Sequence, residues 1–170
     1  MNKILKLTKN FSNIKYIYSS VSRTTPIACN NWISNSSEFQ IRKYSTEVEK
    51  AKTAKWNKNE GTIFDKIISK ELKAEIIHED DRCMAFLDVN PQAPVHFLVI
   101  PKRRIPMLDE SSPEDIELLG HLILTAKNLA KERAPDGYRL VINNGVNGCQ
   151  SVYHLHIHIV GGRQLNWPPG

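Results

Sequence analysis

The chain has 170 residues and a formal net charge of +5, with six histidines, three cysteines and 41% hydrophobic residues. Residues 1–44 contain seven basic residues and one acidic residue, a net charge of +6, so the remaining 126 residues sum to −1. A nearly neutral body gives no electrostatic reason to expect a nucleic-acid-binding protein, and no apolar run approaches the length of a membrane span.

Residues 1–44 have the pattern of a mitochondrial presequence. They are basic, poor in acidic residues and rich in Ser, Thr and Asn, and apolar residues recur at helical spacing between Ile4 and Tyr18. The segment RKYS, residues 42–45, resembles a cleavage signal of the matrix protease. We expect a mitochondrial matrix protein whose mature chain begins near Ser45; the alternative is a disordered basic tail.

The polar, charge-alternating residues 45–60 are predicted to form a flexible leader to one domain at residues 61–170. Cys83 and Cys149 lie in that domain, and neither belongs to a CxxC pair. We expect both thiols to be free in a reducing compartment.

The domain begins with a predicted helix at residues 61–72, because its apolar residues fall on one stripe. Strands are predicted at residues 74–80 and 82–88, joined by a turn at Asp80 and Asp81. A continuous apolar run at residues 96–101 predicts a central strand that is buried on both faces.

A long helix is predicted between Ser112, which can cap it, and Pro135. Its apolar face is expected to comprise Ile116, Leu119, Ile123, Ala126 and Ala130. Strands at residues 138–143 and 151–160 follow, separated by the turn-forming NGVNG. Because most strand connections are too short for a parallel crossover, we predict an α+β domain with a five-stranded antiparallel sheet and two helices.

Three of the six histidines, His154, His156 and His158, occupy alternate positions in the last predicted strand. In a strand their imidazoles would share one face, while the apolar residues between them fill the other. Three neighbouring imidazoles cannot all be protonated, because each positive charge disfavours the next. One neutral nitrogen is therefore available near pH 7 as a nucleophile or a metal ligand.

A nucleophilic histidine needs a partner that fixes its tautomer, donors for phosphate oxygens and an acid for the leaving group. Ser151 offers a hydroxyl, and the preceding NGCQ offers backbone N–H groups. The flanking histidines can orient the central ring and transfer protons. Attack on phosphorus would give a phospho-imidazole intermediate that water can open.

The segments NPQAPVHFLVIPKRRI and CQSVYHLHIHIVGGRQLNWPPG, residues 90–105 and 149–170, closely resemble the histidine triad (HIT) nucleotide-binding proteins. The likeness spans residues 61–170 and, with the basic leader, is nearest to the mitochondrial members. It implies a homodimer with the HIT-like α+β fold. It also implies hydrolysis of adenosine 5′-phosphoramidates to a nucleoside monophosphate and an amine, without a metal or other cofactor.

The resemblance implies a role for each matching histidine. His156 would be the nucleophile that attacks the α-phosphorus. His158 and Ser151 would contact the phosphate and the bond being broken, and His154 and His96 would support the cluster.

The resemblance also implies a nucleotide site. Asp88 would hold the ribose hydroxyls with Val89 beside it. Asn143 would contact the nucleotide near the phosphate, and Cys149 and Gln150 of the following loop would contact it too. Cys149 stands where relatives carry Gly or another small residue. The base pocket would be lined by Ile63, Phe64, Ile67 and Phe86, and Trp167 would complete the pocket of the partner subunit.

Other interpretations of these residues stay open. Asp88 could simply end a strand, Asn143 could form a turn, and the apolar residues could be ordinary core. The alternate histidines with His96 could instead bind zinc. The chain could be a nucleotide sensor without turnover or a dinucleoside polyphosphate hydrolase, although the WPPG tail disfavours the latter. His78 and His121 are interpreted as surface or helix-edge residues.

Overall fold

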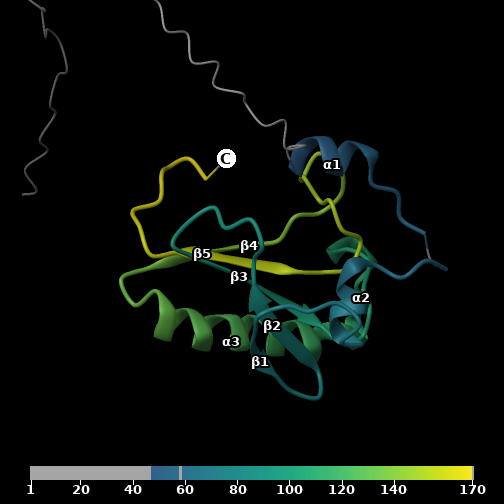
Figure 1. Ribbon diagram of the computed structural model, residues 1–170, viewed down its shortest axis with the longest axis horizontal. Helices are drawn as coiled ribbons and strands as arrows, with labels where there is room; N and C mark the ends of the chain where they lie inside the picture. The colour runs from purple at the N-terminus through teal and green to yellow at the C-terminus, as the bar shows by residue number, and fades with distance from the viewer. Residues whose placement is uncertain (1–46, 58, 170) are drawn as a thin grey trace, which may run out of the picture. The chain divides into compact units, whose positions relative to one another are not determined.

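The computed structural model describes residues 47–57 and 59–169 (Figure 1). The predicted presequence at residues 1–44 lies outside the described residues. No helix in the described part of the chain is long and apolar enough to cross a membrane.

A five-stranded antiparallel sheet forms the centre of the domain, with strand order β1-β2-β3-β5-β4. The predicted α+β fold with a five-stranded antiparallel sheet is thus confirmed. The strands are β1 (Ile76–Glu79), β2 (Cys83–Leu87), β3 (Val95–Pro101), β4 (Tyr138–Val141) and β5 (Ile157–Gly161).

The central strands β2 and β3 are buried on both faces, as the apolar run in β3 predicts. Alternate residues such as Phe97 and Val99 enter a core shared with β5 and α3, whereas Leu98 and Ile100 enter a core shared with α2. Strand side chains alternate between faces, so each central strand supplies two cores at once.

Helix α3 (Ile116–Arg133) covers one face of the sheet (Figure 1). Its predicted apolar face is partly wrong, because Ile116 and Ile123 are 68% and 41% exposed. The buried stripe runs instead through Leu122, Ala126 and Ala130. Leucine or isoleucine occupies several adjacent positions in this helix, so its sequence alone does not fix the rotation about its axis.

The entry to α3 matches the sequence prediction closely. Two short 3-10 helices, η1 (Leu108–Glu110) and η2 (Pro113–Asp115), precede it. The backbone N–H of Ser112 donates to Asp115 Oδ2 at 2.9 Å, one half of a capping box. This reciprocal cap satisfies donors that the first turn leaves free.

Helix α2 (Ile63–Ile68) packs on the other face of the sheet through Phe64 and Ile67. Thr62 caps it, and the Thr62 backbone N–H donates to Asp65 Oδ2 at 2.6 Å. The helix is shorter than predicted, and Lys70 just beyond it has a φ of +64°.

The predicted flexible leader at residues 45–60 is described from residue 47 on, and this part differs from the prediction because Glu47–Thr53 form helix α1 and Ala51 is fully buried. Lys50 pairs with Glu47 one turn away, with Nζ 2.6 Å from Oε1. Arg104 donates to the carbonyl oxygens of Glu60 and Asn57 and so holds the connection to the body. These tertiary contacts are not visible in the polar pattern of the segment.

Candidate active site

The histidine segment lies on the sheet face opposite α3. Strand β5 begins at Ile157 rather than at residue 151, so His154, which lies in a bend, and His156 both precede it. The backbone N–H of Leu155 donates to Ile105 O at 2.6 Å and anchors this stretch. The predicted alternation holds: the three apolar residues enter the α3-side core, while the histidine rings approach Phe64 and one another.

His156 is buried, at 4% exposure, and its tautomer follows from one contact. Nδ1 lies 2.7 Å from the carbonyl oxygen of His154, and a carbonyl can only accept, so Nδ1 carries the proton. The lone pair is therefore on Nε2. Burial lowers the pKa of His156 and outweighs the contacts that raise it, so the ring is neutral at pH 7.

A second pair of rings, His96 and His158, is ordered in the same way. The backbone N–H of Gln92 donates to His96 Nδ1 at 3.1 Å, so the proton of a neutral His96 is on Nε2. That nitrogen lies 3.0 Å from His158 Nδ1 and donates to it. The proton of His158 is consequently on Nε2. Burial, followed by His156 and His96, lowers the pKa of His158 to about 4.

Asp88 lies beside this pair. Its Oδ2 is 3.4 Å from His96 Nε2 and 3.9 Å from His158 Nδ1, and its Oδ1 accepts from the backbone N–H of Asn90 at 2.8 Å. The residue thus follows β2 as the sequence suggests, with its carboxylate among the histidines. Val89, next to it, is fully exposed.

His154 has a supporting position. The ring is fully buried, and Nε2 donates to the carbonyl oxygen of Pro101 at 2.8 Å. Nδ1 lies 3.5 Å from Asp65 Oδ1 without a hydrogen bond. Burial lowers the pKa of His154, against the opposing effect of its contacts with Pro101 and Asp65. The main contribution of His154 to the site is its own carbonyl, which orients His156.

The loop before Ser151 is tightly wound. Cys149 has a φ of +62°, a conformation that favours glycine. A Cβ on Gly148 would lie 2.4 Å from the carbonyl oxygen of Asn144, so this position also requires glycine. Asn143 Nδ2 donates to the Cys149 carbonyl at 3.3 Å. Asn143 therefore holds the loop as well as lying near the predicted phosphate site.

Gln150 is fully buried, and its side-chain amide serves the loop itself. Nε2 donates to the carbonyl oxygens of Pro106 and Val152 at 2.8 and 3.1 Å, and Oε1 accepts from the Gly145 N–H at 3.0 Å. The structure therefore places the predicted nucleotide contact Gln150 behind the loop, where its side chain shapes the backbone.

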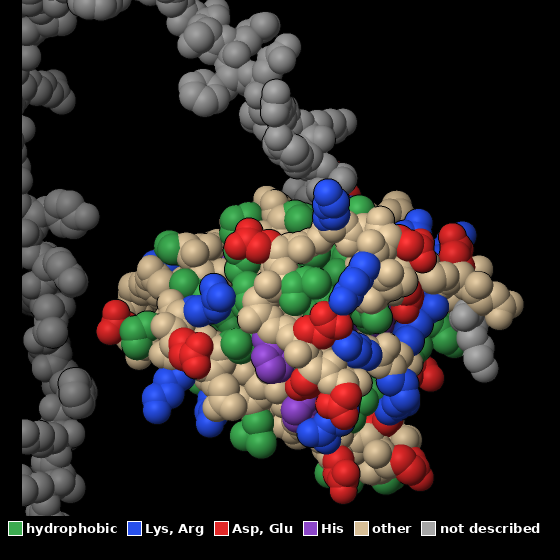
Figure 2. Space-filling view, turned by 60° about the horizontal axis from the view of Figure 1, so that its bottom comes forward, with side chains coloured by type: hydrophobic (Ala, Val, Ile, Leu, Met, Phe, Trp, Pro, Cys, Tyr) green, Lys and Arg blue, Asp and Glu red, His purple; other side chains and the backbone are tan. Residues whose placement is uncertain are grey.

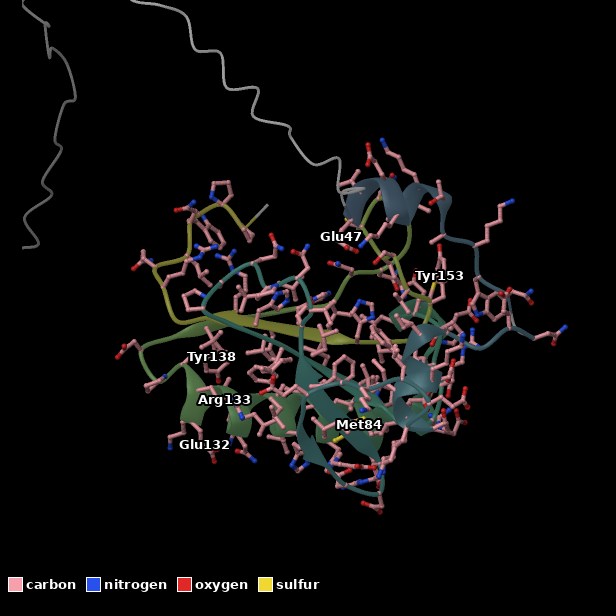
Figure 3. The ribbon with its side chains drawn as sticks, in the orientation of Figure 1. Glu47, Met84, Glu132, Arg133, Tyr138 and Tyr153 are labelled. Carbon is pink, nitrogen blue, oxygen red and sulfur yellow. The ribbon has the colours of Figure 1, made fainter. Side chains whose placement is uncertain are left out.

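Ser151 contacts a residue that the sequence did not indicate. Its Oγ donates to Glu47 Oε2 at 2.7 Å, and Figure 3 shows Glu47 pointing from α1 towards the body of the domain. Burial opposes ionisation of Glu47, but hydrogen bonds from Lys50 and Ser151 outweigh it and lower the pKa. The negative charge acts on His156 and His158 and raises their pKa slightly. Glu47 lies in the segment predicted as a flexible leader, and no motif marks it.

The apolar residues of the predicted base pocket divide into two groups. Phe64, Ile67 and Phe86 are buried in the core beneath α2. Ile63 is 50% exposed and, with Ser151, lines a cavity of about 270 Å³ between the α1 connection and the body. Trp167 is 84% exposed, so most of its ring is open to solvent in the single chain.

The family model for the HIT domain matches residues 69–165 of the chain. An uncharacterized HIT-like protein of Synechocystis is 58% identical over 112 residues, which cover 65% of this chain and 98% of the relative. The 14 kDa zinc-binding protein of Zea mays is 54% identical over 112 residues, which cover 64% of this chain and 88% of that protein.

Solved structures agree with these matches. A HIT family hydrolase from Legionella pneumophila superposes with a TM-score of 0.63 at 44% identity, covering 65% of this chain and all of that chain. A histidine triad nucleotide-binding protein from Candida albicans has a TM-score of 0.55 at 31% identity, covering 64% of this chain and 83% of that chain.

Proposed function

The chain belongs to the HIT family, and on that premise we propose that it is a hydrolase of adenosine 5′-phosphoramidates. It would cleave the P–N bond to give the nucleoside monophosphate and an amine through a nucleotidyl-histidine intermediate. The observation that carries the proposal is the tautomer of His156, whose Nδ1 is held by a carbonyl so that the Nε2 lone pair is free. The homology with hydrolases and nucleotide-binding proteins supports the same chemistry.

In the first step, Nε2 of His156 attacks the α-phosphorus and the P–N bond breaks. The departing amine needs a proton, and His158 carries one on Nε2 because His96 donates to its Nδ1. The His96–His158 pair takes up one proton from solvent as the anionic substrate binds, so that transfer of the His158 Nε2 proton releases a neutral amine and leaves the pair neutral. The backbone N–H groups of the loop before Ser151 are suited to bind the phosphate oxygens.

In the second step, water attacks the phosphorus of the nucleotidyl-histidine and the bond to His156 Nε2 breaks. His158 Nε2, which has no proton after the first step, accepts one from that water, and the His96–His158 pair returns one proton to solvent as the product leaves. The nucleoside monophosphate leaves, and both imidazoles return to their starting tautomers. Each proton given to the amine is thus recovered from water.

Glu47 favours a P–N substrate over a polyphosphate. Its carboxylate holds the Ser151 hydroxyl at 2.7 Å, on the side where we place the bond being broken. A negative charge there repels an anionic polyphosphate leaving group and attracts an amine that becomes protonated. A dinucleoside polyphosphate hydrolase is for this reason the weaker alternative.

The test is a comparison of wild type with His156→Ala and with His156→Gln. AMP binding should persist in both variants, whereas adenosine phosphoramidate turnover should fall by at least about 10³-fold. Wild-type enzyme quenched in alkaline denaturant, in which the P–N bond of a nucleotidyl-histidine survives, should carry a radiolabelled nucleotidyl adduct that both variants lack. Binding without measurable turnover in wild type would instead identify a nucleotide sensor.

We further propose a homodimer. The edge strand β4 has an unpaired side, and Trp167 is exposed near the C-terminus, so both offer surface to a second copy. Light scattering coupled to gel filtration should give twice the chain mass. A monomer at micromolar concentration would contradict this proposal.

Import into the mitochondrial matrix is also a proposal, supported by the charge and composition of residues 1–44. Sequencing the amino terminus of the protein recovered from mitochondria should find it near Ser45. Recovery of chains that begin at Met1 would contradict import by a cleaved presequence.

A further inference from the structure

A second group of histidines lies away from the triad, where β1, the β1–β2 turn, β2 and α3 meet. His78 and His121 are partly exposed, as expected of surface or helix-edge residues. Both also direct a ring nitrogen at one carboxylate oxygen, Asp80 Oδ2, at 3.2 and 2.7 Å. Cys83 Sγ approaches the same oxygen at 3.3 Å.

Hydrogen bonding alone does not account well for this arrangement. Asp80 Oδ1 already accepts from the backbone N–H groups of Arg82 and Cys83 at 2.8 and 2.7 Å. With His78, His121 and the Cys83 thiol, five donors surround one carboxylate. An ionised carboxylate has about four lone-pair sites, so one of these five groups must turn elsewhere, and the Cys83 thiol has a second, longer contact with Thr125 Oγ1 at 3.9 Å.

Three of the six donor pairs have separations close to those around a tetrahedral zinc ion, and the donors of His78, Asp80 and Cys83 all lie within 4.8 Å of one another. Zinc bonds to nitrogen, oxygen and sulfur of about 2.0–2.3 Å separate the donors by roughly 3.3–3.8 Å. The His78–Asp80, Cys83–Asp80 and Cys83–His121 pairs are 3.2, 3.3 and 3.6 Å apart. The 2.7 Å His121–Asp80 pair would have to widen by about half an ångström.

From this geometry we propose that His78, Asp80, Cys83 and His121 form a structural zinc site. Two imidazoles, one thiolate and one carboxylate are donors that zinc accepts in closed tetrahedral sites. The Cys83 thiol loses its proton to solvent as the sulfur–zinc bond forms. The ion joins three secondary-structure elements and so holds the β1–β2 hairpin against α3.

Metal ions can reach this site from solvent. Cys83 Sγ lies at the bottom, fully buried, whereas the side chains of His78, Asp80 and His121 are 36%, 24% and 22% exposed. Figure 2 shows histidine side chains at the surface of this face, bordered by acidic and basic side chains. The ion would enter past the rings and reach the sulfur last.

Arg82 opposes metal binding and provides a sensitive variant. Its Nη2 donates to His121 Nδ1 at 2.8 Å, which leaves the ring proton on Nε2, the nitrogen that faces the proposed ion. Binding therefore requires Arg82 to release Nδ1 so that the proton can move there. Removing the guanidinium should make this exchange easier and also remove a like charge.

The experiment uses the full chain, stripped of metal and dialysed against buffered zinc, with the bound metal measured by mass spectrometry. We expect one zinc ion per chain and a higher midpoint of thermal unfolding when it is bound. With cobalt(II) as the probe, a sulfur-to-metal charge-transfer band should appear. Cys83→Ser should abolish that band, and Cys149→Ser should leave it intact.

His78→Gln changes a partly exposed residue, so it tests the site without disturbing the core. It should lower zinc affinity by more than about 10-fold, and Arg82→Gln should raise the affinity. Asp88→Asn is the matched control, because Asp88, His96 and His158 form another group of possible ligands. The proposal is overturned if His78→Gln binds zinc as wild type does, or if Asp88→Asn abolishes the binding.

Discussion

At the scale of single residues, the order of the imidazole hydrogen bonds decides what each ring can do. The Gln92 N–H fixes His96, and His96 fixes His158, so His96 acts on the proposed reaction only through its neighbour. It is a positioning residue. The contribution of His96 to the rate should depend on whether the leaving group needs the proton of His158, which His96 orients.

His96→Leu should therefore lower kcat for an alkylamine phosphoramidate by about 10²-fold, because general acid catalysis contributes 10²–10⁴-fold. A substrate with a good leaving group, such as an imidazolide, should lose much less. His96→Gln retains an N–H donor and should recover part of the rate in steady-state assays. Equal losses for both substrates in His96→Leu would contradict a positioning role.

Cys149 is the residue whose backbone departs most from its usual preference within the loop before Ser151. Its φ of +62° is unfavourable for any residue except glycine, asparagine or aspartate. Cys149→Gly should stabilise the protein by about 1 kcal/mol, since the relief of strain exceeds the added entropy of the unfolded chain. The unfolding midpoint in a thermal or urea titration would show it.

Cys149→Ala is the control for that experiment, because alanine removes the thiol and keeps the Cβ that makes a positive φ unfavourable. We expect no gain from alanine. Equal stabilisation by glycine and alanine would attribute the effect to the thiol rather than to the backbone.

The residues of the candidate site were predictable to different degrees. The alternate histidines, Ser151 and Asp88 follow from spacing and family likeness. The structure brings His156, His158 and Asp88 together, whereas the Ser151 hydroxyl contacts Glu47. The position of Gln150 behind its loop was not predictable, because a motif names a residue without saying which way its side chain points. The contact with Glu47 joins positions 104 residues apart and has no local signal.

At the scale of elements, α1 is the main difference from the sequence prediction. Seven polar and small residues form a helix only because Ala51 is buried and Arg104 holds the chain that follows. An isolated helix of that length is not stable in water. Its stability therefore comes from the surface on which it lies, the same surface that carries Ser151.

Glu47→Gln should raise the affinity for AMP by about 3- to 10-fold at low salt, because it removes a negative charge near the predicted phosphate site. The gain should decrease as salt is added, since partly exposed charges are screened. Titration calorimetry at two ionic strengths measures both effects. Glu132→Gln, on α3 across the sheet, removes an equal charge and should leave AMP affinity unchanged; a gain there too would indicate a general effect of net charge.

The central strands and the start of α3 were predicted well because their signals are local: a run of apolar residues, and a serine followed by proline and acids. The ends of α2 and β5 were not. His154 and His156 alternate with apolar residues as a strand does, yet they precede β5. The alternating pattern predicts which way the side chains point. It does not predict where β5 begins, because that depends on pairing with a neighbouring strand.

At the scale of the whole molecule, four buried or half-buried histidines make stability depend on pH. Burial is the largest cause that lowers the pKa of His96, His154, His156 and His158. A histidine with a lowered pKa binds protons less well in the folded state than in the unfolded state. Stability is thus greatest above the unfolded value of about 6.5 and falls as the pH drops towards 4.

The unfolding midpoint should therefore decrease steadily between pH 7 and pH 4.5, as measured by circular dichroism in buffers of constant ionic strength. The pKa of His158 is lowered to about 4, so this residue contributes on the order of 2–3 kcal/mol over this interval. His158→Gln should make the decrease shallower. A slope that does not change in this variant would show that His158 does not titrate with unfolding.

The extended stretch from Leu155 to Ile159 serves two purposes with one backbone, since odd positions fill the hydrophobic interior and even positions carry the reactive rings. Adding a single amino acid between His156 and His158 would exchange these assignments downstream, burying an imidazole against α3 and presenting a hydrocarbon to the nucleotide. Insertions and deletions in this segment are consequently not tolerated, whether they arise in evolution or by design. Reactivity here can be tuned only by replacing side chains one for one.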